Sequence, residues 1–171
     1  MKTDVAPVIR LRYYQPPDFL IDRVDMLFDL HPTQTRVRTT MSMRRNPDGF
    51  LSTPLVLEGD ELNFVSLLLD GQPVPAGQFT VAPDKLVMPN TPERAFALTV
   101  ETRLDPSANT KLMGLYLSNG VYCTQCEAEG FRRITYFPDR PDVMAVYRVR
   151  IEADASAVPV LLSNGNPSEV G

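Results

Sequence analysis

The sequence predicts an all-β domain, a sandwich of mainly antiparallel strands. Apolar and polar residues alternate with a period of two in segments from one end of the chain to the other, as in half-buried strands. Sixteen prolines and nine glycines interrupt these segments about every ten residues, a spacing typical of sandwiches and barrels. No stretch of 12 or more residues has the 3.6-residue apolar period of an amphipathic helix.

The first two strands are expected in a hairpin of residues 20–44. Even-numbered residues are apolar from Val24 to Leu30, and the same alternation returns from Thr35 to Met43. His31-Pro32-Thr33 separates the two runs, and proline cannot donate to a strand ladder. These features predict two antiparallel strands joined by a tight turn.

The middle of the chain predicts further strands. Residues 62–69 are apolar on both faces, which favours a central strand ended by Asp70-Gly71. A short hairpin is expected from 78–81 and 86–88. Alternation from Phe96 to Leu104 predicts another strand.

The last third predicts one more long strand, from Val143 to Ile151. A turn or two of helix is expected within 129–140, before Pro141, and a strand entering a turn within 161–167. Together the strands predict a buried core, which includes Val24, Met26, Phe28, Val37, Met41, Phe64, Leu98, Val100, Tyr147, Val149 and Ile151.

Composition excludes several classes of function. The 171 residues carry a net charge of −4 with the signs interspersed, which does not suit nucleic-acid binding. No apolar run approaches the roughly 18 residues of a membrane span, and no signal-peptide pattern opens the chain. Two cysteines fit a reducing compartment, so we expect a cytoplasmic protein.

The few metal-ligating residues do not predict a metal site. Cys123 and Cys126 form a C-x-x-C pair, but structural zinc needs four ligands and His31 is the single histidine. A redox dithiol would need an α/β pattern that the sequence lacks. We therefore expect two free thiols, a solvated turn residue at His31, and no metal ligand or catalytic residue in this chain.

The arginines at positions 36, 38, 44 and 45 lie on the outward face of the strand predicted from Thr35 to Met43 and at its end. Asp25 and Asp29 lie on the strand expected beside it, so cross-strand ion pairs explain the run without a ligand.

The segment 123–130 breaks the alternation and presents Gln125, Glu127 and Glu129 on what is expected to be a loop. A carboxylate beside an amide oxygen complements a primary ammonium group, which offers three donors and a positive charge. A solvated acidic loop explains the same spacing, because exposed glutamates are common.

The string NGVYCTQCEAEGFRRITYFPDRPDV, residues 119–143, resembles the N-terminal domain of bacterial aminopeptidase N, in the gluzincin family of zinc metallopeptidases. Residues 106–110, 114–116 and 161–166 are similar to landmarks of that family in the same order. The likeness is strong over about residues 101–166 and weaker, in pattern more than identity, over residues 13–100.

The resemblance implies a saddle-like β-sandwich that packs on a catalytic domain and forms one wall of its substrate pocket. It implies that Glu127 binds the free α-amino group of a peptide substrate, with Gln125 beside it. The family's zinc ligands and its catalytic groups lie in the next domain, so zinc is expected in the full-length enzyme and the isolated chain is expected to be inactive.

We therefore expect residues 1–171 to form a single β domain, a truncated N-terminal domain of a larger multidomain hydrolase that releases N-terminal amino acids from peptides. The alternative is a non-enzymatic β-sandwich module for protein interaction. A His-Glu-x-x-His motif downstream of Gly171 in the gene would favour the aminopeptidase over the alternative.

Overall fold

The computed structural model describes residues 10–50 and 52–168, and this part of the chain contains strands and two short 3-10 helices but no α-helix. The strands are β1 (Phe19–Asp29), β2 (Thr35–Arg45), β3 (Leu55–Glu58), β4 (Asn63–Leu69), β5 (Gln72–Pro73), β6 (Thr80–Ala82), β7 (Lys85–Met88), β8 (Phe96–Leu104), β9 (Gly114–Ser118), β10 (Val121–Gln125) and β11 (Val146–Glu152). The 3-10 helices are η1 (Leu11–Tyr13) and η2 (Phe131–Arg133). The predicted all-β fold class is confirmed.

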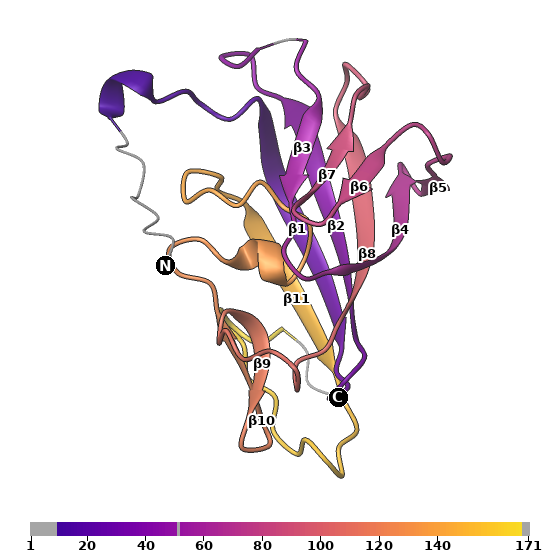
Figure 1. The fold of residues 1–171 in the computed structure, drawn as a ribbon, viewed down its shortest axis with the longest axis vertical. Helices are drawn as coiled ribbons and strands as arrows, with labels where there is room; N and C mark the ends of the chain where they lie inside the picture. The colour runs from indigo at the N-terminus through magenta and orange to yellow at the C-terminus, as the bar shows by residue number, and fades with distance from the viewer. Residues whose placement is uncertain (1–9, 51, 169–171) are drawn as a thin grey trace, which may run out of the picture.

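A six-stranded sheet in the order β11-β1-β2-β8-β4-β5 is the larger layer (Figure 1). β1 and β2 form the predicted antiparallel hairpin. The Thr35 hydroxyl closes its turn, because it donates to the carbonyl of His31 at 2.7 Å and accepts from the His31 N–H at 3.0 Å. The pairing of β1 with β11 is parallel, an exception to the mainly antiparallel arrangement.

A three-stranded sheet in the order β3-β7-β6 lies over the larger sheet and encloses the core with it (Figure 1). Apolar side chains of both sheets are fully buried between them: Val24, Val37, Met41, Leu98 and Val100 from the larger sheet, and Leu55, Leu57, Leu86 and Met88 from the smaller. Burying a side chain of this size contributes roughly 1.5 to 3 kcal/mol, so this layer contact is the main source of stability.

The predicted core is confirmed for most residues and wrong for two. Tyr147 and Val149 are 44% and 37% exposed, although they lie beside the buried Val24 and Met26 in the register of β1 and β11. The alternation identified the core-facing side of β11 correctly. The alternation does not show that β11 lies at the edge of the sheet, where the described residues cover this side only in part.

Two further strand predictions need correction. β4 is not a central strand, because its outer neighbour is the two-residue β5 at the sheet edge. Residues 161–167 form no strand, and Leu161 and Leu162 are exposed. β4 pairs along its length with β8 on one side, but only Leu68 and Leu69 pair with β5 on the other, and residues 161–167 have no partner strand among the described residues.

The arginines of β2 do form cross-strand ion pairs, but with other carboxylates than predicted. Arg36 and Arg38 both bind Glu101 on β8, at 2.6 and 2.8 Å. Arg44 binds Asp22 at 3.2 Å. The prediction considered only β1 as a neighbour, whereas β8 flanks β2 on its other side.

Across residues 10–50 and 52–168, the structure contains no helix that is both long and apolar enough to cross a membrane.

Candidate functional site

The candidate site follows a short hairpin of β9 and β10 that lies apart from the two larger sheets (Figure 1). Asn119 and Gly120 form its turn with φ of 48° and 81°, the left-handed conformation that two-residue hairpin turns require. Gln125 is the last residue of β10 and lies opposite Gly114. The strand therefore continues to Gln125, and the predicted loop begins only at Cys126.

The loop of residues 126–130 closes on itself. A Cβ added at Gly130 would lie 3.2 Å from the Cα of Cys126 and 2.7 Å from the methyl group of Met113. A larger residue here would require the Met113 side chain to move and the backbone at Cys126 to shift slightly, so glycine suits the close approach of the two loop ends. Between these ends, Glu127, Ala128 and Glu129 are exposed, and the peptide bond between Glu127 and Ala128 is cis.

Gln125 ends β10 and Glu127 is the second residue of the loop, and both side chains are exposed. Neither Gln125 nor Glu127 has a side-chain hydrogen bond or ion pair with another described residue, and the structure shows no contact between the two. Glu129 differs, because its carboxylate lies 3.5 Å from Nη1 of Arg132. An incoming ammonium group would therefore meet an unpaired carboxylate at Glu127 and a partly neutralised one at Glu129.

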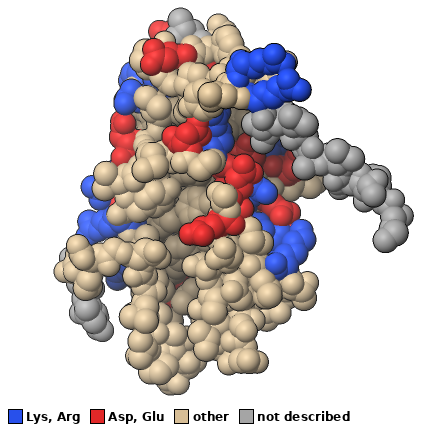
Figure 2. Space-filling model, turned by 90° about the vertical axis from the view of Figure 1, so that its left-hand side faces the viewer, with Lys and Arg blue, Asp and Glu red and all other residues tan. Residues whose placement is uncertain are grey.

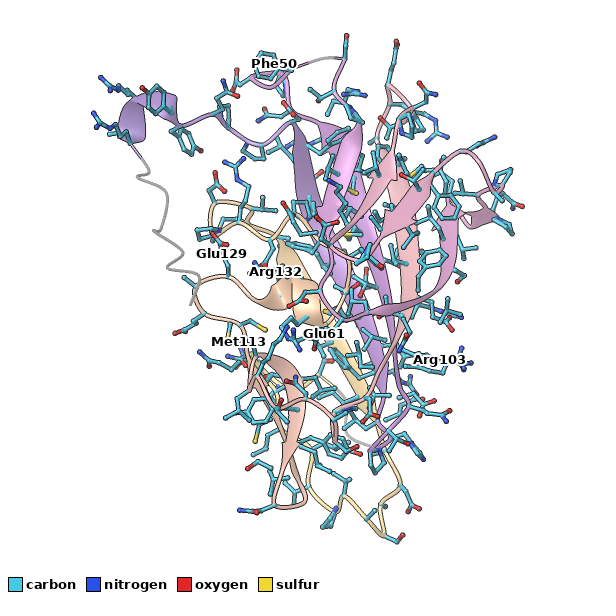
Figure 3. All side chains as sticks on the ribbon, in the orientation of Figure 1. Phe50, Glu61, Arg103, Met113, Glu129 and Arg132 are labelled. Atoms are coloured by element: carbon cyan, nitrogen blue, oxygen red, sulfur yellow. The ribbon has the colours of Figure 1, made fainter. Side chains whose placement is uncertain are left out.

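The buried side chain of Arg133 connects the elements around the site, and the sequence analysis did not identify it. Its guanidinium is buried, donates to the carboxylates of Asp60 and Glu61 at 2.5 Å each, and donates to the carbonyl of Met113 at 3.1 Å. It thereby joins η2 to the β3–β4 turn and to the segment that enters β9. Figure 3 shows Glu61, Met113 and Arg132 gathered around η2.

Ion pairs keep the cluster of Asp60, Glu61, Lys111 and Arg133 charged. Hydrogen bonds from Lys111 and Arg133 lower the pKa of Glu61 to about 2. Burial alone would lower the pKa of Arg133, but its hydrogen bonds to Glu61 and Asp60 outweigh burial and raise it. Figure 2 shows acidic and basic side chains interleaved on the face turned toward the viewer, as such pairing requires.

The cysteines and the histidine do not fit a zinc site. Burial, with the charge of Asp139, raises the pKa of Cys126 to about 11, which disfavours the thiolate that binds metal. His31 lies in the β1–β2 turn, where its Nδ1 accepts from the Thr33 N–H at 3.2 Å. Among the described residues no three His, Cys, Asp or Glu side chains gather in a metal-binding arrangement.

Comparison with known proteins gives close matches. The chain is 52% identical over 171 residues to aminopeptidase N of Caulobacter vibrioides, a match that covers 100% of this chain and 19% of that protein. It is 44% identical over 153 residues to aminopeptidase N of Escherichia coli, covering 90% of this chain and 17% of that protein. The chain thus spans about a fifth of the length of these curated relatives.

Solved structures agree. Legionella pneumophila aminopeptidase A, crystallised with aspartic acid, has a TM-score of 0.83 at 33% identity, over 92% of this chain and 18% of that one. An M1 zinc metallopeptidase of Deinococcus radiodurans shares the fold, with a TM-score of 0.66 at 17% identity over 83% of this chain and 34% of that one. The Peptidase M1 N-terminal domain family matches residues 23–171, and the chain belongs to that family.

Proposed function

We propose that this chain is the N-terminal, non-catalytic domain of a zinc aminopeptidase and that it binds the free α-amino group of a peptide substrate. Glu127 supplies the negative charge and Gln125 an amide oxygen. The observation that carries this proposal is the exposed, unpaired carboxylate of Glu127 on a loop whose two ends are fixed.

A carboxylate in this position explains why an exopeptidase prefers chain ends. A free N-terminus offers an ammonium group that forms a charged hydrogen bond, worth about 1.5 to 3 kcal/mol. An internal peptide bond offers no positive charge, so it would leave the carboxylate desolvated and unpaired. Selection for the N-terminal residue therefore follows from the charge of Glu127.

The partner of this domain in the proposal is a catalytic domain of the same polypeptide. The curated relatives are about five times as long as this chain, and the core-facing side chains of β11 are partly exposed, as expected of a face that another domain covers. That domain supplies the zinc and the groups that cleave the peptide bond. The isolated chain is accordingly inactive.

The proposed substrates are peptides with a free N-terminus. A Deinococcus radiodurans M1 zinc metallopeptidase, which shares the fold of this chain, has been crystallised with a Tyr-Ser-Ala substrate. A cytoplasmic location is part of the proposal, supported by two cysteines that form no disulfide.

The test compares Glu127→Gln with Glu129→Gln in the complete enzyme that the proposal implies. Glu127→Gln keeps the size and one acceptor oxygen but removes the charge, so kcat/KM on aminoacyl substrates should fall roughly 10- to 150-fold. Zinc content should not change, because Glu127 is not a metal ligand.

Glu129→Gln is the matched control, since it removes a neighbouring exposed carboxylate that already pairs with Arg132. Its effect should be several-fold smaller than that of Glu127→Gln. Parent-like kcat/KM for Glu127→Gln would remove Glu127 from the substrate site.

A further inference from the structure

Asp139 is a buried carboxylate that the proposed mechanism does not use. Only 6% of its side chain is exposed, and it lies 12 residues beyond Glu127 in the segment that follows η2. Burying a carboxylate is costly unless it is paired and hydrogen-bonded, so its contacts indicate what it does.

Both oxygens of Asp139 bind the C-terminal base of the 126–130 loop. Oδ1 accepts from the backbone N–H of Phe131 at 3.2 Å, and Oδ2 accepts from Nη1 of Arg132 at 2.6 Å. Phe131 directly follows Gly130, the residue that closes the loop against Cys126. Asp139 therefore fixes the point from which the loop leaves η2.

The other side of Asp139 is fixed to the smaller sheet. Its backbone N–H donates to Oε2 of Glu58 at 2.9 Å, and Glu58 exchanges two backbone hydrogen bonds with Phe137. The carbonyl of Arg132 also accepts from the N–H of Asp60 at 2.9 Å. The loop is thus connected through Asp139 to β3 (Leu55–Glu58), and its position depends on this rigid strand.

Arg132 lies between Asp139 and the loop. The same Nη1 atom that binds Asp139 at 2.6 Å lies 3.5 Å from Glu129, and Figure 3 shows Glu129 and Arg132 close together. The shorter contact is to the buried carboxylate, where a charged hydrogen bond is stronger. While Arg132 is bound there, its cation is held by a carboxylate that lies outside the 126–130 loop.

On the basis of the proposed function, we infer that Asp139 is a positioning residue for Glu127. It sets the direction of the loop through the Phe131 N–H, and it retains the cation of Arg132 away from the carboxylate that receives the substrate ammonium. Loss of the Asp139 charge releases Arg132 toward the loop, where it competes with the substrate.

The test is a double-mutant cycle of Asp139→Asn and Glu127→Gln in the complete enzyme. Asp139→Asn keeps the size and an acceptor for the Phe131 N–H but replaces the charge that binds Arg132. We expect kcat/KM on free-amino substrates to fall about tenfold or more, mainly through a higher KM, because a small misplacement of a binding group is costly. In the Glu127→Gln background the same change should have little further effect, which is the signature of residues that act as a unit.

Glu101→Gln is the matched control. Glu101 is equally buried, with 6% of its side chain exposed, and binds two arginines on the larger sheet away from the loop. It should lower stability but leave kcat/KM per folded molecule unchanged in both backgrounds. Should Asp139→Asn fail to fold, Arg132→Gln tests the same step from the exposed side of the ion pair. It leaves no cation to compete with the substrate, so kcat/KM on free-amino substrates should stay within a few-fold of the parent, and a Glu127-dependent loss of tenfold or more would overturn the role of Asp139 in retaining Arg132.

The outcomes separate this inference from the proposed function. Parent-like kcat/KM for Glu127→Gln alone would overturn the proposed function. A loss for Glu127→Gln, together with an Asp139→Asn effect that is absent, equal in both backgrounds, or matched by Glu101→Gln, would overturn the positioning role and leave the proposed function intact.

Discussion

Glu127 and Glu129 are two residues apart on one loop, yet their surroundings differ. The carboxylate of Glu129 faces Arg132, whereas Glu127 has no partner among the described residues. Exposed ion pairs contribute little to stability, so the pairing of Glu129 matters mainly because it reduces the negative charge available to a ligand. At the scale of single residues, the distribution of the arginines therefore decides which glutamate is free to bind.

The thiol of Cys126 should be unreactive in the folded chain. Burial raises its pKa to about 11, and only the thiolate attacks alkylating reagents. In a Cys123→Ser variant, iodoacetamide labelling followed by mass spectrometry should be slow at pH 7 to 8 and should accelerate toward pH 11 and in urea. Labelling at pH 7 as fast in the native chain as in urea would contradict this.

Glu61 should make stability depend on pH in acid. Hydrogen bonds from Lys111 and Arg133 lower its pKa from 4.5 to about 2. Because the folded-state pKa lies below that of the unfolded chain, the stabilisation is complete above about pH 4.5 and is lost as the pH falls toward 2. Urea unfolding at several pH values should show the stability difference between parent and Glu61→Gln shrinking across this window; a constant difference would contradict the assignment.

At the scale of elements, the β9–β10 hairpin and η2 meet at Gly114. Its φ is +73°, and a Cβ there would lie 2.5 Å from the Cβ of Arg133. This close approach lets the buried guanidinium of Arg133 reach the carbonyl of Met113, one residue before β9. The hairpin and the 126–130 loop are therefore fixed to the same short helix.

Gly114→Ala should destabilise the chain more than Gly120→Ala. Both glycines have positive φ, so each alanine introduces backbone strain of about 1 to 2 kcal/mol. Gly120 has open space around it, whereas Gly114 contacts Arg133, which adds an overpacking cost of about 1 to 3 kcal/mol. Urea unfolding of the two variants measures the difference, and equal losses would show that the contact with Arg133 relaxes freely.

The long strands could be predicted from the sequence, whereas among the short ones the hairpin of β6 and β7 was predicted and several others were not. β1, β2 and β8 are each nine or more residues long, and each shows alternation over seven or more residues, enough to define a period. β3 and β9, with four and five residues, were not predicted, since such short runs carry little periodic information. The parallel pairing of β11 with β1 also leaves no mark in the alternation, which specifies a face but not a neighbour.

The residues of the candidate site were also only partly predictable from the sequence. Gln125 and Glu127 were named from their order along the chain and from a family resemblance. Asp139 and Arg133 were missed because their roles depend on residues far away in sequence: Asp139 on Glu58, and Arg133 on Asp60. Pairings of this kind become visible only once the strands are placed in space.

At the scale of the whole molecule, a closed core and a partly open face lie side by side. The two sheets bury the core between β1, β2 and β8 on one side and β3 and β7 on the other. Beside it, Tyr147 and Val149 of β11 extend the apolar surface into solvent. This arrangement suits a domain that folds around its own core and presents one edge to a larger partner.

Phe28→Ala should therefore cost far more than Val146→Ala. Phe28 is 8% exposed within the core, and removing its ring should cost about 3 to 5 kcal/mol. Val146 is 70% exposed on β11, where its loss should cost less than about 1 kcal/mol. Urea unfolding of the chain provides both values, and similar losses would show that the core has been assigned to the wrong face.

The central claim is that Glu127 recognises the charge of a free N-terminus. The most direct measurement is the inhibition constant of one peptide in free and N-acetylated form, for the parent enzyme and for Glu127→Gln. We predict that the parent prefers the free peptide and that Glu127→Gln reduces this preference roughly 10- to 150-fold, by weakening binding of the free peptide alone. An unchanged preference in Glu127→Gln would contradict the account.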